Sequence, residues 1–243
     1  MIKIKLLLNL IAGLFFFIGV LISLKNKNNK SLVNISIASA FIVLIYLAIF
    51  DILPECLEML GTEKIYLLFI GILAGFLSIL LLEKLIPNHS HYENLEHHEK
   101  HLNHIGIITS LALILHNIVE GISIYAISSS DLKSGLLCLF GVGMHNIPFG
   151  IEITTLLNKE KTNKKWIYLT LLTFSTFIGG LIILIFEKYM TDLVLGFMLS
   201  LSLGMILYLL IFELFIELKE NFNKSSIIGI IIGLIVMIIG LII

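Results

Sequence analysis

The stretch from residue 64 to 86, KIYLLFIGILAGFLSILLLEKLI, indicates the fold class of this chain. Its centre, from Ile65 to Leu82, contains no charged residue and approaches the roughly 20 residues that a helix needs to cross about 30 Å of hydrocarbon. Similar runs recur along the 243 residues, of which 58% are hydrophobic and 14% charged. An ordinary soluble domain has about 25% charged residues. We therefore expect an integral membrane protein with the lipid bilayer as its main solvent.

These apolar runs predict helices and not strands. They are continuous and rich in Leu and Ile, whereas the strands of a membrane barrel alternate apolar and polar residues over about ten positions. A helix satisfies its backbone hydrogen bonds internally, as hydrocarbon requires. We expect one all-α transmembrane domain over residues 1–243, with eight spans at about 6–24, 32–57, 64–86, 105–127, 133–157, 166–187, 192–217 and 226–243.

The lysines predict the orientation of these spans. All 16 basic residues are lysine, and 11 of them lie in the loops that follow spans 1, 3, 5 and 7, against five on the other side. The positive-inside rule places the lysine-rich loops in the cytoplasm and both termini outside, for a multi-pass protein of the cytoplasmic membrane. A net charge of −1 makes nucleic acid an improbable partner. Two cysteines, Cys56 and Cys138, are too few for a secreted disulfide framework.

The longest polar stretch, residues 87–104, reads PNHSHYENLEHHEKHLNH and lies on the predicted cytoplasmic side. A tract this dense in histidine and glutamate is typical of a metal-binding loop, although a solvated polar linker remains an alternative. Its spacing fixes no coordination geometry, so we expect a loose regulatory or buffering site. Its six histidines are His89, His91, His97, His98, His101 and His104.

The remaining two histidines lie inside spans 4 and 5, in the related segments LHNIVEGISI (115–124) and MHNIPFGIEI (144–153). An ionisable residue at bilayer depth costs at least about 2.5 to 3.5 kcal/mol on insertion scales. Several on two adjacent helices therefore need mutual pairing or a function. The histidine, amide and acidic side chains of the two segments are His116, Asn117, Glu120, His145, Asn146 and Glu152.

The spacing of these residues predicts a metal site between the two helices. His116 and Glu120 are four residues apart, and His145 and Glu152 are seven apart, so each pair lies on one helix face. Imidazole and carboxylate together suit zinc and other first-row divalent ions. Pro148 should loosen the second helix locally, as in the interrupted helices of transporter sites. The alternative is that each histidine only hydrogen-bonds a neighbouring helix.

Matching carboxylates occur near the ends of two other spans. Span 2 ends in FDILPECLE (50–58) and span 7 in FELFIELKE (212–220). The predicted topology puts Asp51 and Glu55 toward the outside, and Glu213 and Glu217 toward the cytoplasm. They could form the entrance and the exit of a cation pathway, or they could simply reach the water of the headgroup region.

These segments resemble the ZIP family, the zinc/iron-regulated transporter-like proteins. Span 4 matches the family pattern H-[SN]-x-x-E-G, and DILPE and GMILYLLIFEL are similar to its signatures on helices 2 and 7. The resemblance implies eight helices in an inverted-repeat bundle with helices 4 and 5 at its centre, a cytoplasmic histidine-rich loop and external termini. It also implies transport of zinc, iron, manganese, cadmium or related divalent ions into the cytosol by alternating access. His116, Glu120 and His145 then become the metal ligands, with Asn117 and Asn146 beside them.

Two positions depart from the family pattern. Phe149 occupies the place of the helix 5 glutamate that bridges two metals in many members, and Thr176 occupies a helix 6 place that is often acidic. We therefore expect a single metal ion, with water or Glu152 completing its coordination.

Two other functions remain open at this point. Phe149 could block the path and leave a metal sensor that does not transport. Alternatively, a metal held by the same ligands could activate water in an intramembrane hydrolase, with Glu152 as general base. We expect transport and not an enzyme, because carboxylate pairs near both membrane faces indicate a pathway. The Gly71-x-x-x-Gly75 pattern in span 3 adds a homodimer as an expectation.

Overall fold

A computed structural model describes residues 2–26, 29–85, 95–130, 132–157, 164–189 and 191–242. Apart from short turns, this part of the chain is helical, and it contains no strand. The prediction of an all-α protein is therefore confirmed. The elements are α1 (Ile2–Lys25), α2 (Lys30–Tyr46), η1 (Leu47–Ile52), α3 (Leu53–Leu60), η2 (Thr62–Lys64), α4 (Ile65–Leu85), α5 (Leu95–Ser130), α6 (Leu132–Leu157), α7 (Lys165–Phe186), η3 (Glu187–Tyr189), α8 (Asp192–Tyr208), η4 (Leu209–Leu214), α9 (Phe215–Glu220) and α10 (Lys224–Ile242).

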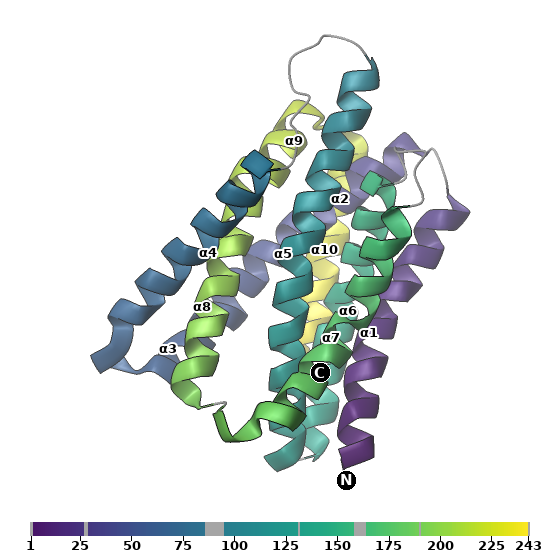
Figure 1. Ribbon diagram of the computed structural model, residues 1–243. Coiled ribbons are helices and arrows are strands. Elements are labelled where there is room, and N and C mark those ends of the chain that lie inside the picture. The colour runs from purple at the N-terminus through teal and green to yellow at the C-terminus, as the bar shows by residue number, and fades with distance from the viewer. Residues whose placement is uncertain are drawn as a thin grey trace.

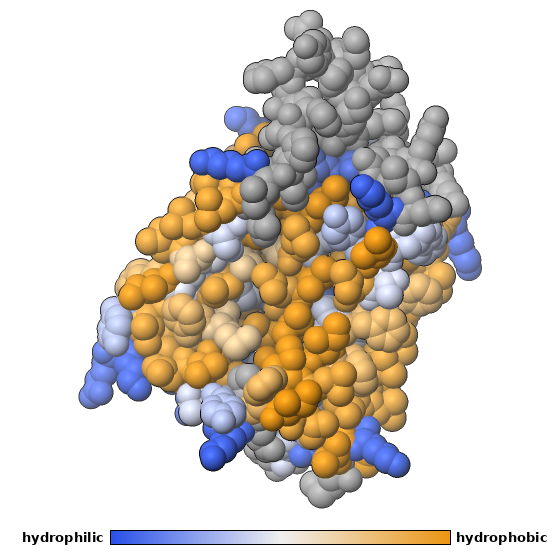
Figure 2. Space-filling model, viewed as in Figure 1, coloured by the Kyte–Doolittle hydropathy of each residue, from blue (hydrophilic) through white to orange (hydrophobic). Residues whose placement is uncertain are grey.

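The helices have the length and the surface of a multi-pass membrane protein. Among the described residues, six segments are long and apolar enough to cross a bilayer, and the apolar segment Lys224–Ile238 is shorter. Large apolar side chains face outward on several of them, with Phe69 65% and Ile185 71% exposed. Figure 2 shows orange, apolar side chains over the middle of the molecule and blue, hydrophilic ones toward its two ends. Such a belt is the surface that lipid requires.

The helices pack as two groups. In one group, α1 packs on α6 and α7, and α5 packs on α6 and α7. In the other, α4 and α3 pack on α8, and α10 packs on α2. The groups meet mainly where α2 lies against α6 and where α5 lies against α8, and Figure 1 shows α4 and α8 standing apart from α1, α6 and α7. We call them the α5–α6 group and the α2–α8 group.

Glycines allow the closest helix approaches within each group. A Cβ at Gly121 would collide with the backbone carbonyl of Thr176 on α7, and one at Gly75 would collide with the backbone of Leu201 on α8. Membrane helices use small residues in this way because lipid offers no hydrophobic driving force between them. Gly71 likewise contacts Ser200 of α8. The Gly71-x-x-x-Gly75 pattern thus serves packing inside one chain and gives no support to a homodimer.

Two segments of the chain share both a sequence and an unusual backbone. YLAIFDILPECLE (46–58) and YLLIFELFIELKE (208–220) each place a six-residue π-helical segment, η1 or η4, at the same point after a 17-residue helix. Tyr46 stacks on Phe50 and Tyr208 stacks on Phe212, with ring centroids 5.2 Å apart in both pairs. π-Helical turns are rare and often occur at functional sites. The repeat therefore indicates a shared role for these two segments, one in each half of the sequence.

Two local expectations differ from the structure. α5 begins at Leu95, so residues 95–104 are helical instead of belonging to the loop predicted at 87–104. Leu, Glu and Lys in this stretch favour helix, so α5 begins before the apolar segment that starts at Leu102. α6 also continues through Pro148 without interruption. The irregular backbone lies instead in η1 and η4.

Candidate metal centre

Three side chains from two helices, α5 and α6, converge inside the protein. Oε1 of Glu120 lies 3.0 Å from Nε2 of His116 and 2.9 Å from Nε2 of His145. The potential ligand atoms of the three residues all lie within 4.8 Å of one another. All three residues are buried. In the described part of the chain, this is the group of histidine and acidic residues that could hold a metal ion.

Helix geometry explains why these residues meet. His116 and Glu120 are one turn apart on α5, and side chains with this spacing lie on the same face. α6 packs directly on α5 and brings His145 to that face. The structure thus brings the three predicted residues together, and their role as metal ligands remains a prediction.

The ligand set suits a divalent ion that prefers nitrogen and oxygen donors. Two imidazoles and one carboxylate are typical of zinc with an open fourth position, and zinc lies about 2.0 to 2.2 Å from such donors. His116 Nε2, whose lone pair can bind a metal, faces Oε1 of Glu120 at 3.0 Å. A cation between the three side chains would use that lone pair and compensate the buried carboxylate.

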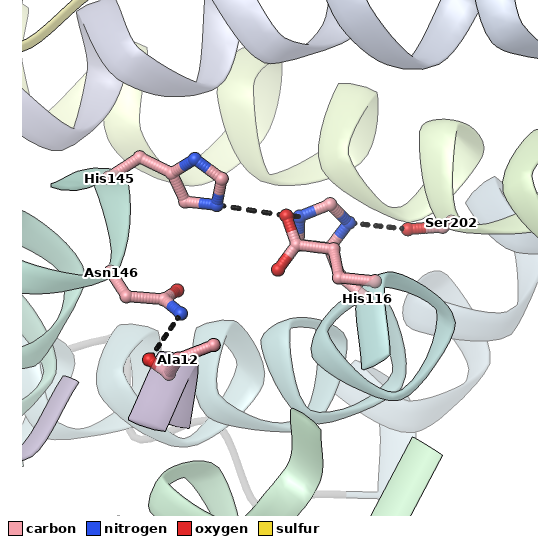
Figure 3. A network of polar contacts seen from close by, with 6 residues as sticks. Ala12, His116, His145, Asn146 and Ser202 are labelled. Carbon is pink, nitrogen blue, oxygen red and sulfur yellow. Dashed lines mark hydrogen bonds and ion pairs between the residues drawn. The ribbon is translucent and has the colours of Figure 1, made fainter. Parts of the chain in front are cut away.

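The two predicted asparagines flank the trio without joining it. Asn146 donates from Nδ2 to the backbone oxygen of Ala12 on α1, at 3.3 Å, so its amide ties α6 to α1 (Figure 3). Asn117 is buried, and its Oδ1 has no hydrogen-bond partner in the described part of the chain.

Glu152 lies outside the trio as well. Its side chain is fully buried, and neither carboxylate oxygen has a hydrogen-bond partner among the described residues. Its role as a metal ligand remains a prediction.

The residues that replace the acids of the family pattern are also buried. Phe149 is 1% exposed, and its ring centroid lies 5.9 Å from that of His145. The Thr176 side chain on α7 is buried, and its hydroxyl makes no hydrogen bond within the described structure. An apolar ring therefore occupies the space one helical turn beyond His145.

A cavity of about 420 Å³ connects the trio with α3. His116 and Glu120 line it from the trio. From α3 it is lined by the half-buried Glu55 and the exposed Glu58. We call this cavity the vestibule. It brings the predicted entrance residue Glu55 into one space with His116 and Glu120, while the side chain of Asp51 lies outside the described structure. The residues that line the vestibule are Phe50, Ile52, Pro54, Glu55, Glu58, His116, Glu120, Ser123, Ile127, Cys138, Val142 and Leu199.

The predicted exit carboxylates lie in a closed region. Glu213 in η4 is 6% exposed and Glu217 in α9 is 2% exposed. Asn221 donates from Nδ2 to Oε1 of Glu217 at 2.7 Å. The two carboxylates are thus packed into the protein at the end of the molecule opposite α3 (Figure 1).

The predicted loop metal site can be placed only in part. His89 and His91 lie outside the described residues, and the same holds for the side chains of His97, His98 and His101. His104 is buried within α5.

One contact in this region is not predicted by the sequence. Ser202 on α8 lies 3.0 Å from Nδ1 of His116, and a serine in an apolar helix gives no signal of such a contact. The likeness between the two carboxylate-bearing segments extends beyond their acids, because 46–58 and 208–220 share Tyr, Leu, Ile, Phe and two Glu positions at the same spacing.

The sequence is similar to those of known zinc transporters. A family model described as the ZIP zinc transporter matches residues 88–241, which include the whole trio. The zinc transporter ZupT of Shigella dysenteriae serotype 1 is 28% identical over 150 residues, covering 58% of this chain and 55% of that protein. ZupT of Escherichia coli O127:H6 gives the same figures, and ZupT of Chlorobium limicola is 26% identical over 142 residues, 51% of this chain and 53% of its own. The chain thus spans about half the length of the curated relatives it matches.

Proposed function

The chain belongs to the ZIP zinc transporter family, and from this premise we propose that it carries divalent metal ions, zinc first among them, across the cytoplasmic membrane toward the cytosol. The observation that carries the proposal is the buried trio of His116, Glu120 and His145, of which His116 and Glu120 line the vestibule. The printed names of the relatives support zinc as the cargo. Iron, manganese and cadmium are further candidates on the same donor chemistry.

We infer that the site holds one ion at a time. His116, Glu120 and His145 supply one set of ligand atoms. One turn beyond His145, the Phe149 ring stands where a carboxylate could have bound a second ion. Zinc in a site with three protein ligands keeps an open position for water. Such incomplete coordination allows the ion to leave again, as transport requires. Glu152, which lies beyond Phe149 on α6, could take the ion next.

The difference in accessibility between the two ends of the molecule supports alternating access. The vestibule links the trio with Glu55 and Glu58 at the α3 end, whereas Glu213 and Glu217 at the α9 end are buried. Such a difference is expected of a carrier whose path is open on one side and closed on the other. The lysine distribution favours the α3 end as the outside, so this arrangement is one that receives metal. Motion of the α5–α6 group against the α2–α8 group would then expose the trio to the other side.

Zinc uptake into proteoliposomes that hold the purified chain tests the proposal. We expect uptake by the parent chain and none above empty liposomes in His116→Ala. Glu63→Gln, a change at an exposed position in η2, serves as the control and should keep parental uptake.

The position of Phe149 favours a metal sensor as the second candidate function. Zinc bound by the parent with no uptake in the same liposomes would identify the sensor. Absence of both binding and uptake would contradict both functions.

A further inference from the structure

The two ring nitrogens of His116 face different partners. Nε2 points to Oε1 of Glu120 and to the centre of the trio, and Nδ1 lies 3.0 Å from Oγ of Ser202. Both His116 and Ser202 are 1% exposed, so water does not compete for this contact. Figure 3 shows Ser202, on α8, beside the imidazole of His116.

This arrangement fixes the form of the imidazole that a metal needs. A neutral histidine carries one proton, and a metal bound at Nε2 leaves that proton on Nδ1. The Ser202 oxygen is placed to accept the hydrogen bond from Nδ1–H. Partners of this kind orient metal-bound histidines and raise their basicity, and their loss typically costs 10- to 100-fold in metal affinity.

The contact also joins the two helix groups. His116 is on α5 and Ser202 is on α8. By contrast, the hydrogen bonds Ser23–Thr155 and Asn146–Ala12 join α1 to α6 inside the α5–α6 group. Motion of one group against the other would therefore leave the trio intact but would separate Ser202 from His116.

Resting on the proposed function, we propose that Ser202 is a positioning residue for His116, which makes the zinc affinity of the trio depend on the relative position of the two helix groups. With the contact formed, His116 presents Nε2 to the ion in a fixed orientation. With the contact broken, the ring is free to turn and the same three ligands hold zinc more weakly. Binding on one side and release on the other would then follow from one hydrogen bond.

The test measures zinc affinity of the full chain in lipid nanodiscs by competition with a chelator. We expect Ser202→Ala to bind zinc 10- to 100-fold more weakly than the parent, because Nδ1 loses its acceptor. Ser202→Thr keeps the hydroxyl and should restore affinity to within about threefold of the parent. The thermal unfolding of each variant without zinc is recorded beside its affinity.

Ser200→Ala provides the matched control. Ser200 is fully buried on the same helix, and its hydroxyl donates to the backbone oxygen of Gly196 on α8 itself, at 2.7 Å. Its affinity should stay at the parental value. Equal affinities of Ser202→Ala and Ser200→Ala would overturn the inference, as would a loss in Ser202→Thr as large as in Ser202→Ala. A parent chain that binds no zinc would instead overturn the proposed function.

Discussion

Glu120 and His145 lie 25 residues apart in the chain, yet Oε1 of the first is 2.9 Å from Nε2 of the second. The contact joins α5 to α6 in the interior of the bundle, and His116 completes it from one turn away on α5. A carboxylate between two imidazoles can bind a divalent cation with only small movements of the three side chains.

Glu120→Gln should weaken zinc binding by more than about 100-fold, since even the loss of an outer partner costs 10- to 100-fold. The amide keeps the shape of the side chain but removes the only negative charge of the trio. Isothermal titration with zinc measures the effect, with Glu63→Gln as a control of the same chemistry at an exposed position. An affinity of Glu120→Gln within threefold of the control would exclude Glu120 as a ligand.

Phe149→Glu should raise the number of bound zinc ions from one to two. The new carboxylate would stand one turn from His145, where the ring now lies 5.9 Å from the imidazole. Phe149→Leu removes the ring without adding a charge and should still bind one ion. Metal analysis of the purified variants by mass spectrometry gives the stoichiometry. One ion per chain in Phe149→Glu would refute the view that the ring replaces a second metal position.

Zinc binding should weaken as the medium is acidified through the range in which histidine ordinarily takes up a proton, near pH 6.5. The direction follows because each imidazole must be neutral to ligate, so protons compete with the metal. Titrations of the parent between pH 7.5 and 5.5 test this. A zinc affinity that stays constant over that interval would speak against His116 and His145 as ligands.

Cys138 should react with a membrane-impermeant thiol reagent added from outside the cell. It is half-buried and lines the vestibule, whereas Cys56 is fully buried. Single-cysteine variants, Cys56→Ser and Cys138→Ser, separate the two thiols when labelling is read by mass spectrometry. Labelling of Cys138 only from the cytosolic side would reverse the proposed orientation.

The sequence predicted the all-helical fold and the meeting of His116, Glu120 and His145 for physical reasons. Hydrocarbon thickness sets the length of an apolar run, so each predicted range falls on a helical segment. The spacing of four between His116 and Glu120 fixes their shared face without any tertiary information.

Other features depend on contacts that no local pattern encodes. Ser202 lies 86 residues from His116, and its role depends on how α8 packs against α5. The π-helical backbone of η1 and η4 is set by hydrogen-bond register and not by composition. The beginning of α5 at Leu95 was missed because polarity was interpreted as a loop, although Leu, Glu and Lys also favour helix.

X-ray absorption at the zinc edge, on the parent chain loaded with one equivalent of zinc, tests the central claim most directly. The account predicts two imidazole ligands and light oxygen donors at about 2.0 to 2.2 Å, with one imidazole lost in His145→Ala. A spectrum with sulfur at about 2.3 Å, or one that His145→Ala leaves unchanged, would contradict a zinc site at His116, Glu120 and His145.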